Sequence, residues 1–295
     1  FKVNKSVYSD MQRIWDMYHT KAHINLIVCG SIFSMMTKIF KDKKEPLYNR
    51  QTRFMSIKPF TPAVLKEIMA EYNPNYTSED LLALYSFTGG VAKYVQLLVD
   101  AGATTKTKML NHIIKADSVF LGEGKAILIE EFGKDYGVYF SILSAIARGK
   151  TLRSEIEQIV GREIGGYLTK LEKEYEVITK NQPIFEKSST KNVRYTIEDN
   201  FFTFWFRFIY KYNYMLEIEN FDAVKTIINR DYETFSGKML ERYFKRVLME
   251  SKAYTRIGSW WDRKGENEID IVAENELNDE AVFIEVKRKE DNFDA

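Results

Sequence analysis

Two short alternating segments near the carboxyl end of the chain constrain its fold most. Residues 268–273 read Glu-Ile-Asp-Ile-Val-Ala, and residues 281–287 read Ala-Val-Phe-Ile-Glu-Val-Lys. Polar and apolar side chains alternate in both segments, which is typical of β-strands with one buried face. The polar stretch between them, residues 274–280, is typical of a turn. The pair therefore predicts a β-hairpin.

The register of this hairpin follows from its turn. With the turn centred between residues 277 and 278, Asp270 lies opposite Glu285 and Ile271 lies opposite Ile284. One face is then aliphatic, because side chains two residues apart share a face, and a slip of one residue would bury the carboxylates. The other face carries four charged side chains, namely Glu268, Asp270, Glu285 and Lys287.

The charged face suggests metal chemistry. Two carboxylates on opposed strands can share a hard divalent cation such as Mg²⁺, and Asp270 and Glu285 are the candidate metal ligands. The metal would polarise a phosphate and generate hydroxide from bound water. Lys287 is placed to orient the nucleophile or offset phosphate charge, and Glu241, on a predicted helix over 236–249, is a further candidate carboxylate. The alternative is a solvated strand face with cross-strand ion pairs.

This arrangement resembles the PD-(D/E)XK nuclease superfamily, whose pattern is a helical Glu, then Asp, then Glu-x-Lys on a hairpin. The resemblance maps the catalytic roles onto Glu241, Asp270, Glu285 and Lys287. Ile269 stands where the family usually has Pro. The resemblance implies Mg²⁺-dependent hydrolysis of DNA; a nuclease-like fold that has lost activity is the alternative.

Length and composition limit the number of domains and the classes of partner. The 295 residues are enough for two or three domains, and the net charge of +1 gives no global basic field to attract nucleic acid. The single cysteine, Cys29, cannot form an internal disulfide and indicates a reducing compartment, so we expect a cytoplasmic protein. We expect no membrane partner, because no apolar run reaches transmembrane length. The chain begins without Met and stops soon after the Glu-x-Lys strand, so we expect a fragment.

The first sixty residues resemble the end of an AAA+ type ATPase core. Residues 24–29, Ile-Asn-Leu-Ile-Val-Cys, predict a buried parallel strand that ends in Gly30-Ser31, where α/β sheets place ligands. The resemblance implies that Ser31 is the sensor residue and that Arg50 of the Pro-Leu-x-x-Arg segment is the arginine finger. It also implies that residues 56–60 form the strand that closes the ATPase core. The alternative is ordinary structure, a strand-end turn and a surface loop.

The chain lacks the motif that would bind the phosphates of ATP. A P-loop requires Gly-x-x-x-x-Gly-Lys-Ser/Thr after a strand, and the chain has none. ATP is therefore expected in the intact protein and not as a stable ligand of this chain alone. An arginine finger would act on a neighbouring subunit or domain, so a homo-oligomer is a candidate assembly.

Residues 61–131 predict helices. Thr61-Pro62 and Thr77-Ser-Glu-Asp80 are typical helix starts, and we interpret residues 121–125 as a loop. Thr88-Gly-Gly90 breaks a helix and resembles the lid of AAA+ type signal-transduction ATPases, in which a Gly-Gly segment faces the nucleotide. A plain turn between helices is the alternative.

Residues 132–231 resemble a winged helix followed by a helical region. Helices are predicted over 138–147, 151–160 and 162–173, and strands over 176–180 and 192–197. The resemblance places the third helix in a DNA major groove, with Arg162, Lys170 and Lys173 as candidate contacts; a winged helix that only packs domains together is the alternative. Residues 199–210 are rich in aromatic side chains at helical spacing and predict a buried helix.

The expected fold class is α/β multidomain. Its parts are a partial P-loop ATPase core (1–60), a helical lid (61–131), a winged-helix and helical region (132–231) and an incomplete nuclease-like domain (232–295). This order resembles archaeal and bacterial AAA+ type ATPases with a nuclease-like carboxyl-terminal domain. The expected function is metal-dependent DNA hydrolysis within an ATP-dependent, DNA-acting protein. The alternative is a non-catalytic DNA-binding or protein-interaction module of a regulatory ATPase.

Overall fold

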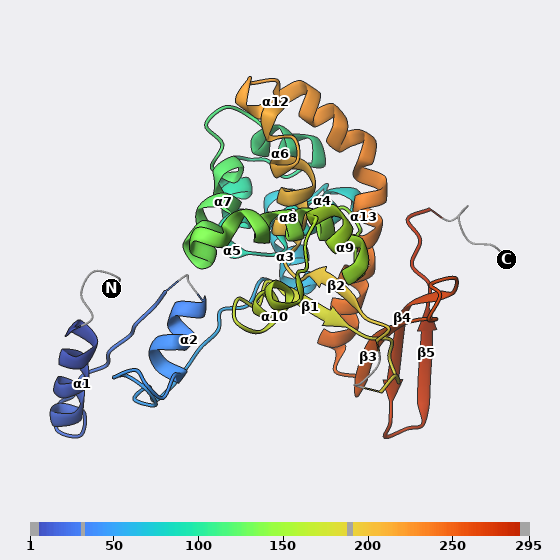
Figure 1. Ribbon diagram of the computed structural model, residues 1–295. Coiled ribbons are helices and arrows are strands. Elements are labelled where there is room, and N and C mark those ends of the chain that lie inside the picture. The colour runs from blue at the N-terminus through green and yellow to red at the C-terminus, as the bar shows by residue number, and fades with distance from the viewer. Residues whose placement is uncertain (1–5, 31–32, 188–190, 290–295) are drawn as a thin grey trace.

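The computed structural model describes residues 6–30, 33–187 and 191–289. These residues form a mixed α/β protein that is mostly helical, with two small antiparallel sheets (Figure 1). None of the helices in the described ranges is both long and apolar enough to cross a membrane.

The amino-terminal part holds two helices, α1 (Ser6–Tyr18) and α2 (Phe33–Lys41), around a small apolar cluster of their own. The strand expected over 24–29 is wrong: this stretch has no regular structure, and Ile27 is 80% exposed. The closing strand expected over 56–60 is also absent, and Ile57 is 84% exposed. A parallel strand needs neighbours to pair its backbone and cover both faces, and the described residues place none beside these segments.

A helical body follows, and its helix starts are those expected from the sequence. Thr61 caps α3 by accepting the Val64 N–H, and Thr77 and Asp80 form a capping box at α4. The body comprises α3 (Pro62–Tyr72), α4 (Ser78–Thr88), α5 (Ala92–Asp100), α6 (Lys106–Ile113) and α7 (Val119–Phe132).

The loop expected over 121–125 is wrong, because these residues lie within α7. The Trp205 ring packs directly on the helix backbone at Gly124, where a Cβ would come within 2.4 Å of it. The indole N–H of Trp205 also donates to the Leu121 carbonyl at 3.0 Å. This glycine therefore provides space for a ring and does not interrupt the helix.

Three helices and a hairpin come next, in the predicted order, after a short 3-10 turn η1 (Gly133–Asp135). Gly161 adopts a left-handed φ of 74° at the expected turn between the second and third of these helices. The elements are α8 (Tyr136–Ala147), α9 (Arg153–Val160), α10 (Gly165–Lys173), β1 (Ile178–Asn181) and β2 (Arg194–Ile197), with β1 antiparallel to β2.

The aromatic stretch is buried, as predicted. It forms α11 (Asn200–Phe204), the π-helical η2 (Trp205–Tyr210) and then α12 (Asn213–Glu217). Its side chains occupy the centre of the main apolar core, and the Arg207 guanidinium lies 5.5 Å from the ring centre of Phe208. The role of this stretch in the described structure is packing.

One long helix, α13 (Phe221–Ser251), joins the helical body to the carboxyl-terminal sheet (Figure 1). Its first half contributes Val224, Ile228 and Tyr232 to the main core. The helix is continuous across residues 231 and 232, the boundary expected for the last domain. The main core and the carboxyl-terminal sheet are therefore joined by one continuous helix.

The sheet has the order β3 (Arg256–Trp261), β4 (Glu268–Asn275), β5 (Glu280–Ile284), all antiparallel. Ile271 pairs with Ile284, which confirms the predicted hairpin register. Ile271 and Ala273 on the aliphatic face are fully buried. The same register places Asp270 and Glu285 just beyond the last paired residues.

Hydrogen bonds and an ion pair connect the β1–β2 hairpin and its loop to this sheet. The Trp261 indole N–H donates to Asn192 Oδ1 at 2.9 Å, and Arg194 pairs with Glu268 at 2.9 Å. The Ile184 N–H donates to the Ser259 carbonyl at 2.8 Å. The β1–β2 hairpin thus packs against the β3–β4–β5 sheet.

Candidate functional site

Asp270 ties β4 to the segment that follows β5. Its Oδ2 accepts the backbone N–H of Val286 at 2.8 Å. This side-chain bond takes the place of backbone pairing beyond the ladder, which ends at Ile284. Asp270 is half-buried, as expected for a side chain near the covered end of the sheet.

Glu285 and Lys287 lie in this segment, and the Lys287 ammonium contacts the Glu285 carboxylate. That hydrogen bond is the main cause of a raised pKa for Lys287, and the charges of Glu285, Asp270 and Glu241 raise it further. Glu285, Asp270 and Glu241 are therefore all near enough to Lys287 for their charges to act on it.

Glu241 comes from α13 and is half-buried beside the sheet. Lys238, one helical turn earlier, approaches its two carboxylate oxygens to 2.9 Å and 3.0 Å. Burial raises the pKa of Glu241 to about 7, Lys238 lowers it, and the carboxylates of Asp270 and Glu268 raise it. A carboxyl with this pKa is only partly ionised near neutral pH.

Each candidate metal ligand has a partner within the protein. Lys238 neutralises Glu241, Lys287 neutralises Glu285, and the Val286 N–H occupies one oxygen of Asp270. Across the described ranges, no three Asp, Glu, His or Cys side chains converge closely enough to hold a metal ion. The all-oxygen donor set suits Mg²⁺ chemically, but a shared ion would have to draw Glu241 or Glu285 away from its lysine.

The candidate DNA contacts sit elsewhere. Arg162 precedes α10, Lys170 and Lys173 lie in its last turn, and all three side chains are exposed. The Arg162 guanidinium lies 6.0 Å from the Tyr167 ring centre. Helix α10 and the three-stranded sheet lie apart, with the β1–β2 hairpin between them (Figure 1). The basic and carboxylate groups therefore form two separate candidate sites.

Of the nucleotide-related candidates, Ser31 lies outside the described residues. Arg50 forms a two-pronged pair with Asp16 of α1, at 2.9 Å for both contacts, and donates to the Pro46 carbonyl at 2.8 Å. These hydrogen bonds hold the pKa of the Asp16 carboxyl below its ordinary value. An arginine finger at this position would first have to release Asp16.

The Gly89-Gly90 segment is closely packed. Both glycines have left-handed φ values, and a Cβ on Gly90 would lie 2.5 Å from the Phe60 carbonyl oxygen. The Phe60 N–H donates to the Gly90 carbonyl at 2.7 Å. These glycines thus hold the connection between the amino-terminal part and the helical body.

Two residues near the site make contacts that the sequence did not predict. Lys238 precedes Glu241 by three residues, a spacing that places both on one helix face and gives a usable signal. Arg288 pairs with Glu79, 209 residues earlier, and no local pattern points to such a contact.

Of the comparisons with known proteins, one concerns this region and another nearly the whole chain. Residues 205–295 match DUF234, described as archaeal and bacterial proteins of unknown function, and this span includes all four candidate catalytic residues. The chain is 33% identical over 304 residues to the uncharacterized protein MJECL04 of Methanocaldococcus jannaschii. That match covers 98% of the chain and 65% of the relative's length. No solved structure matches the chain.

Proposed function

We propose that α13 and the β3–β4–β5 sheet form a PD-(D/E)XK-like site that hydrolyses DNA phosphodiester bonds with Mg²⁺, within a longer ATP-dependent protein. The observation that supports this most is the hydrogen bond from the Val286 N–H to Asp270. It links the end of β4 to the segment that carries Glu285 and Lys287, and the charge of Glu241 on α13 acts on Lys287 from nearby.

Mg²⁺, when bound, would polarise the scissile phosphate and lower the pKa of a bound water. Asp270 and Glu285 would hold the ion, and Glu241 would assist as a further carboxylate. Lys287 would leave Glu285 to orient the water or to stabilise charge on the phosphate. ATP would be bound by residues outside those described, and a homo-oligomer would allow Arg50 to reach a neighbouring nucleotide site.

The test uses Asp270→Asn, in which the amide oxygen can still accept the Val286 N–H while the charge is lost. Labelled single- and double-stranded DNA is incubated with the chain in Mg²⁺, Mn²⁺ or chelator. Cleavage by the unchanged chain should require metal and fall by at least about a hundredfold in Asp270→Asn. Lys287→Ala should lose comparable activity.

Asp279→Asn is the matched control. Asp279 is exposed in the turn of the same hairpin at a φ of 52°, which asparagine adopts readily. This variant should cleave normally. Cleavage that persists in Asp270→Asn, or that ignores chelator, would remove the assignment.

A second candidate function is DNA binding without cleavage. The order α8, α9, α10, β1, β2 and the exposed Arg162, Lys170 and Lys173 support a winged helix whose third helix contacts DNA. Replacing the three side chains with Gln should weaken DNA binding and flatten its salt dependence, because fewer phosphates are neutralised. Absence of any DNA binding at low salt would instead favour a protein-interaction module.

A further inference from the structure

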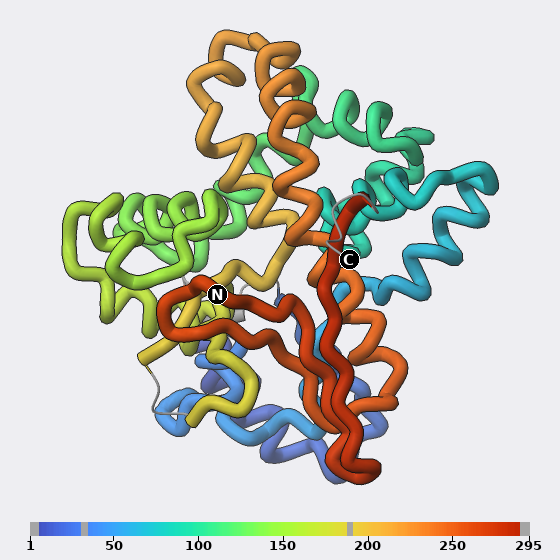
Figure 2. Tube along the Cα trace, turned by 90° about the vertical axis from the view of Figure 1, so that its right-hand side faces the viewer, coloured from blue at the N-terminus to red at the C-terminus, as the bar shows by residue number. Residues whose placement is uncertain are grey.

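The segment that carries Glu285 and Lys287 lacks the support of the sheet. Backbone pairing between β4 and β5 ends at Ile271 and Ile284, so residues 285–289 lie beyond the ladder. Figure 2 shows the chain after β5 rising along α13 toward the helical body. Its side-chain contacts must therefore fix where Lys287 lies.

One such contact is the hydrogen bond from the Val286 N–H to Asp270, and Lys289 adds another by pairing with Glu233 of α13 at 2.6 Å. Arg288 provides the contact that reaches two helices. Its guanidinium donates to Ser236 Oγ on α13 and to Glu79 Oε2 on α4, and it lies 5.4 Å from the ring centre of Tyr232. The Arg288 side chain is only 19% exposed. Lys287 thus sits between two fixed neighbours.

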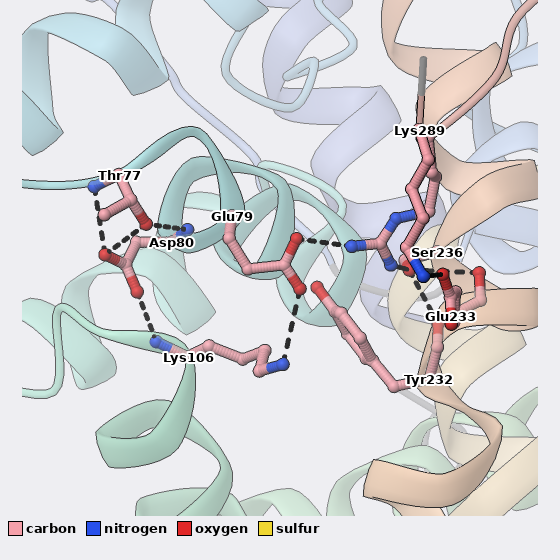
Figure 3. A network of polar contacts seen from close by, with 9 residues as sticks. Thr77, Glu79, Asp80, Lys106, Tyr232, Glu233, Ser236 and Lys289 are labelled. Atoms are coloured by element: carbon pink, nitrogen blue, oxygen red, sulfur yellow. Dashed lines mark hydrogen bonds and ion pairs between the residues drawn. The ribbon is translucent and has the colours of Figure 1, made fainter. Parts of the chain in front are cut away.

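The acceptors of Arg288 are themselves held in place (Figure 3). Lys106 pairs with Glu79 at 3.3 Å, and its ammonium lies 4.6 Å from the Tyr232 ring centre. The Ser236 hydroxyl donates to the Tyr232 carbonyl at 2.6 Å, so its oxygen remains available to accept from Arg288. The Arg288 site is therefore built by two helices of the body and not by the sheet.

The chemistry of the contact requires arginine. A planar guanidinium can donate from separate nitrogens to two acceptors on different helices, whereas a lysine ammonium acts as a single point. Val286 and Arg288 flank Lys287 in the sequence, so holding both limits the positions that the Lys287 side chain can reach. In the structure this side chain contacts Glu285.

We propose that Arg288 is a positioning residue: by joining α4 and α13 it fixes the segment that holds Lys287 over the carboxylate face. The proposal rests on the proposed function for its catalytic consequence, but the anchoring itself can be measured without activity.

The experiment compares Arg288→Met, Arg288→Lys and Glu79→Gln in the whole chain, with Arg263→Met as control. Arg263 is exposed in the β3–β4 connection. Hydrogen exchange at the Val286 amide reports the anchoring. It should become about tenfold faster or more in Arg288→Met, with the amides of β3 and β4 unchanged. Arg288→Lys should recover part of the protection, and Arg263→Met should match the unchanged chain.

DNA cleavage provides the second measurement. In Arg288→Met, kcat should fall by about tenfold to a hundredfold, because a shift of about 1 Å at a catalytic group has that effect. KM for DNA should stay within about twofold, since the reaction step and not the DNA-binding surface is disturbed. Arg288→Lys should restore part of kcat.

The outcomes separate the two proposals. If the unchanged chain does not cleave DNA in Mg²⁺, the proposed function fails, and Val286 exchange alone decides whether Arg288 anchors the segment. Unchanged exchange in Arg288→Met overturns the anchor, and faster exchange with an unchanged kcat overturns the positioning role. If Arg288→Met does not fold, Glu79→Gln, which keeps an acceptor but removes its charge, should show the same two changes in weaker form.

Discussion

Replacing Gly124 with Ala tests whether Trp205 packs directly on the backbone of α7. A Cβ at residue 124 would lie 2.4 Å, 2.7 Å and 2.9 Å from three ring atoms of Trp205. Carbon atoms prefer separations of about 3.5–4.0 Å, so the indole would have to move by about 1 Å.

The indole has little room to do so. Trp205 is 2% exposed, its ring centre lies 6.1 Å from that of Phe140, and its N–H bonds to the Leu121 carbonyl. Overpacking of this kind costs about 1–3 kcal/mol, and disturbing the hydrogen bond costs about 1 kcal/mol. Alanine returns about 1 kcal/mol through helix propensity. Gly124→Ala should therefore lower the free energy of unfolding by about 1–3 kcal/mol.

Gly122 provides the matched control in the same helix. It is exposed, and a Cβ there would meet no atom within 4 Å. Gly122→Ala should raise the free energy of unfolding by up to about 1 kcal/mol. Urea unfolding followed by circular dichroism measures both variants. If Gly124→Ala proves as stable as Gly122→Ala, Trp205 does not pack on α7 as described.

Two further predictions concern charge. Lys238 lowers the pKa of Glu241, so Lys238→Met should raise that pKa. The acidic limb of the pH profile of metal-dependent cleavage should then move to higher pH. An identical pH profile in Lys238→Met and in the exposed control Lys264→Met would contradict this. Arg50 lowers the pKa of Asp16. The pair should therefore stabilise the docking of α1 at pH values above the unfolded pKa of Asp, about 3.9, and this stabilisation should be lost as the pH falls below it. Hydrogen-exchange protection in α1, taken relative to the intrinsic exchange rate at each pH, should fall on acidification, and Asp16→Asn should reproduce the loss of protection at neutral pH.

Local chemistry explains which parts of the fold were predictable. The hairpin register followed from alternation and a turn, because a slip would have exchanged its two faces, and the Ile271–Ile284 pair confirms it. Helix starts at Thr61 and Thr77 were predictable because each side chain bonds to its own first turn. The same register brings Asp270, Glu285 and Lys287 to one end of the hairpin, whereas Glu241 is brought there by the packing of α13 against β4.

Features that depend on distant partners were not predictable. The glycines among residues 121–125 suggested a loop. The actual reason for Gly124 is the Trp205 ring that packs on it, and Trp205 lies 81 residues later in the sequence. Residues 24–29 have the composition of a buried strand, but a strand exists only where another pairs with it. Arg288 had no local signal, because its partner Glu79 is brought to it only by the packing of α4 against α13.

The continuity of α13 links the candidate site directly to the main apolar core. Its 31 residues extend over about 46 Å, and Glu241 lies about 30 Å along the axis from the first residue, Phe221. Met239 and Tyr243, on either side of Glu241 in the sequence, are buried in the main core. A substitution that repacks this core would therefore move Glu241 without touching the sheet, and catalytic groups must be held to within roughly 0.5 Å.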